Sequence, residues 1–444
     1  MEDNLNRLVR QFEVAEEASQ NGRRDAERAR DYYDGAQLTD DERRVLAKRR
    51  QPPVVSNLIK PKIDYLRGLE RQGRTDPKAY PRTEHDDEAA NAATDALRYV
   101  ARDQSVDIKR SAVFENMLIE GFGGAEVTVA KTKGGIDPKI TYIAWDRLFA
   151  DPHSSAHDYA DAAYKGYVTW MDAEAAKARF EGKDAVIDAT VEKPTSSATD
   201  TYEDKPKWTY WADKTRKRVR IVTQYYKTGG VWHWCLYTLA GMFQESEPSP
   251  YLDDEGRPEC PLILQSAYID RDNDRYGIVR DMFDPQDEVN KRRSKGLHLI
   301  NSRQVRISRA SGIDKEVARR ELARPDGIII ADQGEVEVLQ TTDMTAGHFN
   351  MYQDAKTTLE RMGPNATMQG KAGQDQSGRA ILALQQGGMV EMAPLLDALR
   401  HFNIRLYRQV WNRIRQFWTD ERWVRITDDE RNVRFTVLNT TQGA

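Results

Sequence analysis

Cysteine is scarce in this chain of 444 residues. The two that occur, Cys235 and Cys260, both stand beside apolar or aromatic neighbours. A disulfide framework or a cysteine zinc site needs more cysteines at closer spacing, so both are poorly supported. We expect the two thiols to be small core residues.

Long hydrophobic runs are missing as well. No stretch approaches the roughly 18 to 20 apolar residues that span a bilayer, and the N-terminal sequence MEDNLNRLVRQF lacks the apolar core of a signal peptide. We therefore expect a soluble, intracellular protein. Its 67 basic and 71 acidic side chains give a formal net charge of -4, which indicates no bulk attraction to nucleic acid.

The sequence also lacks the common motifs of catalysis. Gly370-Lys371 is followed by Ala372 and has no P-loop glycine spacing before it, and the seven histidines form no HExxH pair. The glycines of segment 121–124 lead from a helical pattern into a strand, the reverse of the order that aims N–H groups at phosphate. We expect no enzymatic activity, no cofactor and no metal.

The densest group of acidic and imidazole side chains lies in one polar segment. It comprises Asp151, His153, His157, Asp158 and Asp161. A nuclease would need such carboxylates to converge on divalent ions, which a single segment cannot establish. We expect a turn capped by its own carboxylates and keep a metal-dependent packaging or recombination nuclease as the alternative.

The patterns that are present favour an α+β fold that is mainly helical, built from two or three units. Helical spacing dominates as far as residue 121, alternation typical of strands follows, and helical spacing then returns. The expected helices are 4–30, one followed by a turn within 31–59, one that opens at Pro61, two within 86–121, 171–180, 276–300, 314–322, 344–362 and 379–418. Kinks are expected in the last of these at Gly387-Gly388 and Pro394. The expected strands are 125–129, 140–143, 163–170, 218–226, 231–239, 262–269, 423–426 and 433–437.

Several local strings occur in the order found in one protein family. They are Tyr33-Asp34-Gly35, Arg49-Arg50-Gln51-Pro52, Ser56-Asn57-Leu58-Ile59, Gly68 with Glu70-Arg71-Gln72, Glu120-Gly121-Phe122-Gly123-Gly124, Asp151-Pro152, Tyr276-Gly277-Ile278-Val279-Arg280 and Ser377-Gly378-Arg379-Ala380-Ile381. Each string alone is weak, but their order over nearly the whole chain resembles the portal proteins of short-tailed (podophage-type) bacteriophages. Such a protein is a ring subunit through which a double-stranded DNA genome enters and leaves the capsid.

The resemblance implies a portal-type fold with named parts. Residues 1–275 would form the wing, helical first and then β-rich, followed by a first stem helix at 276–301 and a clip at 302–342. A second stem helix at 343–362 would lead to a tunnel loop at 363–378. A long kinked wing helix at 379–419 and a wing hairpin with its tail at 420–444 would complete the chain. A helical crown or barrel, common in the family after this hairpin, is expected to be absent or removed.

The resemblance also implies partners. We expect a dodecameric ring at one capsid vertex of the virion, assembled in the host cytoplasm, with no membrane contact. Its partners would be double-stranded DNA, bound without regard to sequence, the terminase large subunit, head-tail adaptor proteins and the major capsid protein. A scaffold or adaptor ring that does not admit DNA remains a further alternative.

Two groups of candidate site residues follow from the implied layout. In the tunnel loop we expect DNA contacts from Gln369, Lys371, Gln374 and Arg379, and backbone freedom at the hinge glycines Gly363, Gly370, Gly373 and Gly378. On the first stem helix, Lys291, Arg292, Arg293 and Lys295 spread around the axis, so they form no continuous stripe. A solvated or salt-bridged helix is the favoured interpretation, and phosphate steering by one or two of them is the alternative.

The aromatic residues near the C-terminal end have two interpretations. Phe402, Tyr407, Trp411, Phe417, Trp418 and Trp423 could stack on bases, as in proteins that bind single strands. Their helical spacing favours a place in the core, and duplex DNA hides its base faces.

Overall fold

The computed structural model describes most of the chain. The described residues are 2–49, 51–81, 83, 86–132, 135–192, 197–198, 211–213, 215–301, 304–309, 312–322, 328–330, 332, 335–339, 342–364, 368, 378–419, 422–427 and 433–438. About half of these residues are helical and the rest of the regular structure is sheet, which confirms the expected mixture of helices and strands. No described helix is both long and apolar enough to cross a membrane.

The chain divides into two compact units. Unit 1 comprises Met1–Arg30, Ile63–Arg280 and Met389–Ala444, and unit 2 comprises Asp31–Lys62 and Asp281–Gly388. Three long helices cross a boundary between units, namely α2 (Gln20–Asp34), α4 (Ile59–Gln72) and α12 (Gly378–Phe417). Each unit is therefore assembled from segments far apart in the sequence.

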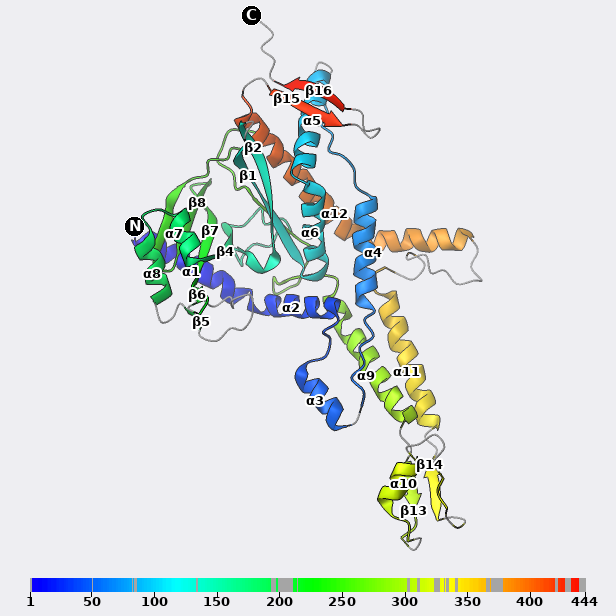
Figure 1. The fold of residues 1–444 in the computed structure, drawn as a ribbon. Coiled ribbons are helices and arrows are strands. Elements are labelled where there is room, and N and C mark those ends of the chain that lie inside the picture. The colour runs from blue at the N-terminus through cyan, green and yellow to red at the C-terminus, as the bar shows by residue number, and fades with distance from the viewer. Residues whose placement is uncertain are drawn as a thin grey trace, which may run out of the picture. The chain divides into compact units, whose positions relative to one another are not determined.

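Unit 1 is built on two sheets (Figure 1). The first is antiparallel, in the order β10-β1-β2, from β1 (Phe122–Thr132), β2 (Gly135–Ile143) and β10 (Leu262–Ser266). The second has seven strands, with the path β3-β4-β7-β6-β5 and with β8 and β9 continuing from β7. Its strands are β3 (Leu148–Ala150), β4 (Tyr164–Asp172), β5 (Ser197–Ala198), β6 (Ala212–Asp213), β7 (Arg218–Thr228), β8 (Val231–Thr238) and β9 (Gly241–Pro248).

Strand β7 is covered on both faces, as its almost unbroken run of buried residues requires. Val222 and Tyr226 face a cluster with Phe12 of α1 (Glu2–Ala18). Val219 and Ile221, one position out of phase, pack with α7 (Ala173–Arg179) and α8 (Asp184–Glu192). Each large apolar side chain buried this way contributes about 1.5 to 3 kcal/mol.

Helices complete unit 1. They are α5 (Asp87–Asp103), α6 (Val106–Ile119), most of α4 and the C-terminal part of α12. Two small antiparallel pairs are added, β11 (Tyr268–Ile269) with β12 (Arg275–Tyr276), and β15 (Arg422–Thr427) with β16 (Val433–Leu438). The last pair confirms the expected terminal hairpin.

Unit 2 contains two long helices that pack against each other, α9 (Phe283–Asn301) and α11 (Thr342–Arg361). Between them in sequence lie β13 (Gln304–Ile307), α10 (Lys315–Leu322) and β14 (Val336–Leu339), and the two strands pair antiparallel. Figure 1 draws α9 in green beside α11 in yellow. The unit also holds α3 (Asp40–Lys48) and the first residues of α12.

Three expectations about the elements are corrected. The helix expected from residue 276 begins at Phe283, because Arg275 and Tyr276 pair with β11 and Arg280–Met282 is a 3-10 turn. Pro285 therefore lies in the first helical turn, where its missing N–H breaks no hydrogen bond. The strand expected over 262–269 is split between β10 and β11, and the sequence analysis missed β3, β9 and α8.

Candidate functional site

The four basic residues expected on the first long helix lie on α9, and three of them have partners inside unit 2. Arg292 forms an ion pair with Glu288 at 2.5 Å, and Lys291 lies 3.8 Å from Asp287. Arg293 donates a hydrogen bond of 2.8 Å to Ser56 Oγ. The salt-bridged interpretation is favoured for this helix, because two of the four cations are paired with carboxylates of the same helix.

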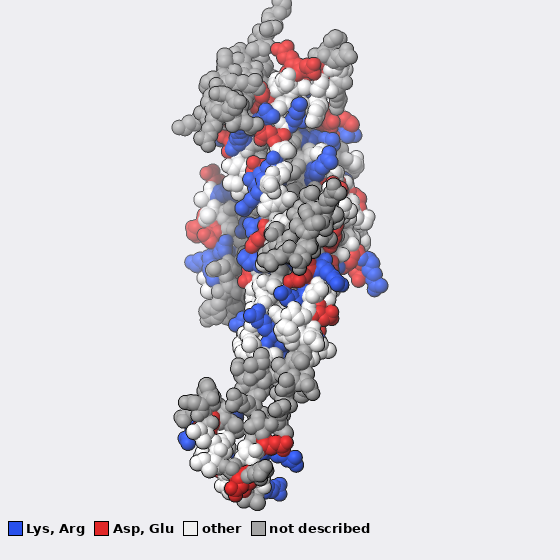
Figure 2. All heavy atoms as spheres, turned by 90° about the vertical axis from the view of Figure 1, so that its right-hand side faces the viewer, with Lys and Arg blue, Asp and Glu red and all other residues white. Residues whose placement is uncertain are grey.

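A surface groove runs along α9 beside α11 and has a volume of about 470 Å³. It is lined by three carboxylates, three cations and one imidazole, namely Asp284, Asp287, Glu288, Lys291, Arg292, Lys295 and His348. We call it the α9/α11 groove. On the face that Figure 2 shows, basic and acidic side chains are interspersed among other residues and form no continuous band of one sign.

The root of the expected tunnel loop is held by a buried lysine. Lys62, on α4 and 4% exposed, donates hydrogen bonds to the carbonyl oxygens of Glu360 (3.1 Å), Met362 (2.7 Å) and Pro364 (2.9 Å). The last carbonyls of a helix lack partners within the helix, and a cation at this end also favours the helix dipole. Gly363 has φ of +67°, the left-handed conformation that ends helices at glycine.

Of the other expected loop residues, Gly378 and Arg379 are described. Gln369, Gly370, Lys371, Gly373 and Gln374 lie outside the described residues. Gly378 begins α12, and Arg379 follows it in the same helix. These positions stay predictions.

Met368 is another described residue of the loop, and the sequence analysis did not single it out. Met368 is 6% exposed and lies against Gly388 of α12, where an added Cβ would overlap the Met368 sulfur. Gly388 was expected to kink the helix. Its missing side chain leaves space for Met368, while the expected kinks at Gly387-Gly388 and Pro394 stay a prediction.

The sequence did carry a signal for Lys62 that was overlooked. Ile59, Lys62, Ile63 and Leu66 are spaced i, i+3, i+4 and i+7, and all four are buried. A lysine on such an apolar stripe predicts a buried ammonium group with dedicated acceptors.

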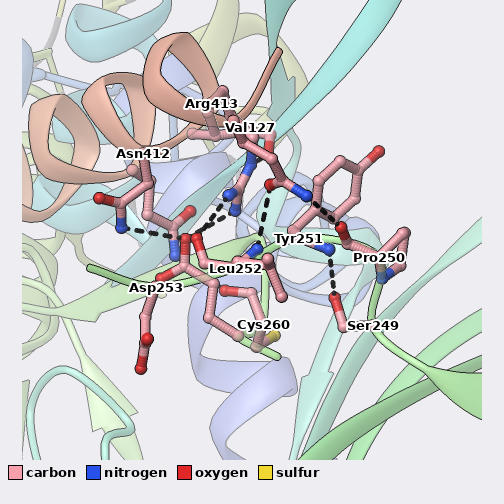
Figure 3. A network of polar contacts seen from close by, with 12 residues as sticks. Val127, Ser249, Pro250, Tyr251, Leu252, Asp253, Cys260, Asn412 and Arg413 are labelled. Carbon is pink, nitrogen blue, oxygen red and sulfur yellow. Dashed lines mark hydrogen bonds and ion pairs between the residues drawn. The ribbon is translucent and has the colours of Figure 1, made fainter. Parts of the chain in front are cut away.

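The C-terminal part of α12 is bound to unit 1 by a network of polar contacts around Arg413 (Figure 3). This fully buried guanidinium donates to the carbonyl oxygens of Val127 (3.2 Å) and Leu252 (3.1 Å) and pairs with Glu259 at 2.7 Å. Burial lowers the pKa of Arg413 and the Glu259 carboxylate opposes that effect. Removing one partner of such a pair leaves the other charged and buried, so the network fixes how α12 lies on the strands.

The aromatic residues of α12 belong mainly to the core. Phe402 is fully buried and Trp418 is 5% exposed, with its Nε1 donating to the carbonyl oxygen of Ile136 at 3.0 Å. Tyr407, Trp411 and Phe417 are partly buried, and the side chain of Trp423 lies outside the described residues. Their place in the protein interior favours the core interpretation over base stacking.

The acidic segment after β3 forms a capped turn. Asp161 accepts hydrogen bonds from Ser154 Oγ (2.6 Å), the Ser155 backbone N–H (2.7 Å) and the Ala156 backbone N–H (3.2 Å). Asp151 accepts from the N–H groups of His153 and Ala163 in the same way. Within the described part of the chain no three His, Cys, Asp or Glu side chains are placed to hold a metal. The carboxylates are engaged by their own turn, which does not favour the nuclease alternative.

Both cysteines are core residues, as expected. Cys235 and Cys260 are buried and unpaired by any disulfide. Burial raises the pKa of the Cys235 thiol to about 12 and that of Cys260 to about 11. The thiolate is the reactive form, so neither side chain is suited to nucleophilic chemistry.

Two strings on which the resemblance depends lie in contact in unit 1. Gly121 has φ of +100° and packs against the backbone of Tyr276, while Gly277 packs against the carbonyl oxygens of Leu118 and Ile119. A Cβ at either glycine would overlap these backbone atoms. The two glycines therefore allow the end of α6 and the segment after β12 to approach closely.

Comparison with known proteins matches residues 9–444 to the phage P22-like portal protein family. One similar protein is the portal protein of Helicobacter pylori bacteriophage KHP30, which is 21% identical over 425 residues. The alignment covers 93% of this chain and 66% of that relative. The chain thus spans slightly less than two thirds of the length of the relative.

Proposed function

The chain belongs to the phage P22-like portal protein family, and we propose that it is a subunit of the ring channel through which a tailed bacteriophage packages and ejects its DNA. The observation that carries this proposal is the family match from residue 9 to residue 444. It spans both units, so it is not the likeness of one shared module. The ring sits at one capsid vertex in this proposal and has twelve subunits.

The parts of the ring are assigned by their order in the chain. α9 and α11 form the stem, the elements between them form the clip, and residues 363–378 form the tunnel loop. Unit 1 supplies most of the wing, crossed by α12. The two long helices that pack against each other and the small β13-β14 sheet with α10 support this assignment.

The charge distribution supports a channel that does not bind its DNA tightly. Each phosphate that a protein neutralises adds affinity that falls with salt, so many free cations would slow a sliding duplex. On α9, Arg292 and Lys291 are paired with Glu288 and Asp287. Contacts to DNA then come from the tunnel loop, through Gln369, Lys371, Gln374 and Arg379, without reading the sequence.

The energy for translocation comes from a partner in this proposal. The chain carries no P-loop motif, and the terminase large subunit docks at the clip to drive packaging. Head-tail adaptor proteins replace it there afterwards, and the major capsid protein surrounds the ring. The protein itself performs no covalent step.

The tunnel loop offers a direct test. We expect Lys371→Glu combined with Gln374→Glu to repel DNA phosphates and to lower the amount of nuclease-protected DNA in assembled heads about tenfold or more. The mass of the ring should not change, because the substitutions lie in a loop. Lys131→Glu, at an exposed position of β1, is the control with the same kind of charge reversal. Normal packaging by the double variant contradicts the role of the loop.

A further inference from the structure

Helix α3 of unit 2 is largely exposed, with only Glu42 and Leu46 half-buried. None of its nine residues is buried, and Val45 keeps 44% of its surface exposed. An isolated helix shorter than about 12 to 15 residues is marginal in water. The capping box between Thr39 and Glu42 strengthens its start but buries no apolar surface. The helix therefore lacks the packing that normally stabilises one so short.

The outward face of α3 has a definite charge order. Asp41, Val45 and Lys48 are spaced i, i+4 and i+7, so they share one face, with the carboxylate first and the ammonium last. Asp41 and its ion-pair partner Arg44 have side chains 88% and 74% exposed. Lys48 has no partner among the residues that the structure describes.

The α9/α11 groove has the same order of charge. Asp284, Glu288, Lys291 and Lys295 follow one face of α9 at spacings of i, i+4, i+7 and i+11, acidic first and basic last. The middle positions are already paired, Glu288 with Arg292 and Lys291 with Asp287. The end residues, Asp284 and Lys295, make no ion pair or hydrogen bond with any described residue.

Two helices with the same charge order complement each other when they lie antiparallel. Lys48 of α3 then faces Asp284, Asp41 faces Lys295, and the two helix dipoles oppose each other favourably. Residues 41–48 span about 11 Å and residues 284–295 about 16 Å at 1.5 Å per residue, so the two long lysine side chains must reach inward to make both end contacts. Val45 in the middle meets the alkyl parts of the groove side chains and Met351, which is 52% exposed and lies 3.2 Å from Arg292 Nη1.

We propose that α3 of one subunit docks antiparallel into the α9/α11 groove of the next subunit, with Lys48 against Asp284 and Asp41 against Lys295. The occupant is a second copy of this chain because α3 and the groove carry complementary end charges. Lys48, Asp284 and Lys295 have no partner among the described residues, and Asp41 would exchange its exposed ion pair with Arg44 for Lys295. A contact between two different surfaces is heterologous and repeats from copy to copy, so it closes a ring when the rotation allows. The inference rests on the proposed ring.

Charge exchange tests this pairing. We expect Lys48→Glu alone, or Asp284→Lys alone, to place like charges together and to raise the concentration of half-assembly about tenfold, as measured by mass photometry in about 0.1 M salt. The double variant carrying both changes should assemble like the unchanged protein, which also shows that neither change prevents folding. Lys315→Glu, at an exposed position of α10, is the matched control and should assemble normally.

A mixture of the two single variants tests the pairing between subunits more stringently. Each interface in a mixed ring that alternates the two variants again pairs opposite charges, so an equimolar mixture should form rings at a concentration where neither variant does. Normal assembly by both single variants overturns the proposal and means that the groove has a different occupant. Failure of the double variant and of the mixture also overturns it. In both cases the ring formed by the unchanged protein still tests the portal function separately.

Discussion

At the scale of single residues, the charged side chains of Lys62 and Asp161 stabilise the fold. Both use a charge to satisfy several backbone groups at once, Lys62 three carbonyls and Asp161 two N–H groups and two hydroxyls. Replacing such a side chain lowers the free energy of unfolding, because its hydrogen-bond partners would be left unpaired. Sequence analysis expected the capped turn around Asp161 and missed Lys62.

Replacing Lys62 with methionine should loosen the end of α11. We expect Lys62→Met to lower the free energy of unfolding by about 2 to 4 kcal/mol, because three carbonyl oxygens lose a charged donor while the volume is nearly kept. Amide hydrogen exchange around residues 359–364 should quicken. Lys60→Met, at an exposed position of the same helix, is the control. Equal rates of amide hydrogen exchange in the two variants would contradict this role of Lys62.

Asp161 gives a dependence on pH with a definite sign. Partial burial alone would raise its pKa, but hydrogen bonds from Ser154, Ser155 and Ala156 outweigh this and lower the pKa to about 2, from 3.8. A lowered pKa in the folded state stabilises the protein above pH 3.8, and this stability is lost as the pH falls towards 2.

The substitution Asp161→Asn measures that contribution. We expect it to lower the free energy of unfolding by about 1 kcal/mol at pH 7, a value discounted because the side chain is exposed. The difference from the unchanged protein should shrink as the pH falls from about 4 to 2. Asp254→Asn, at an exposed position in a turn, is the control.

Added Mn²⁺ should leave the melting temperature of the unchanged protein the same. A higher melting temperature in the presence of the ion would instead favour the nuclease alternative.

At the scale of elements, the sequence predicts most helices and strands but not their partners. The strand patterns of β4, β7 and β8 and the periodicity of α5, α6, α11 and α12 were sufficient to locate them within a few residues. The start of α9 was placed too early, because pairing of β12 with β11 overrides the local helical pattern. A contact such as that of Met368 with Gly388 joins residues from different segments of the chain, so no local sequence pattern predicts it.

The close approach of α6 and the segment after β12 is such a distant contact, and it can be tested at Gly277. We expect Gly277→Ala to lower the free energy of unfolding by about 2 to 4 kcal/mol, because its Cβ overlaps backbone atoms of α6 that cannot move aside easily. Gly68→Ala is the control in open space within α4, and it should stabilise the helix by about 0.5 to 1 kcal/mol. Thermal or denaturant unfolding distinguishes the two, and a Gly277→Ala protein as stable as Gly68→Ala contradicts this account.

At the scale of the whole molecule, the division into units could not be read from the sequence. The length of the chain suggested two or three units, but unit 2 combines residues 31–62 with residues 281–388, which no composition change marks. The family could be recognised from the sequence because the resemblance depends on the order of short strings of residues. Those strings include Gly121 and Gly277, which make the close backbone contacts. The DNA-contacting loop was proposed from its position alone, since its residues make no periodic pattern.

The central claim is that the chain closes into a ring with a channel for duplex DNA. Electron-microscope class averages of the purified full-length protein test it most directly, scored for rotational symmetry and for the width of the axial hole. The account predicts closed rings, twelve-fold in symmetry, with an axial hole wide enough to admit duplex DNA. A uniform monomer or dimer under conditions that permit assembly, or a ring too narrow for a duplex, would contradict it.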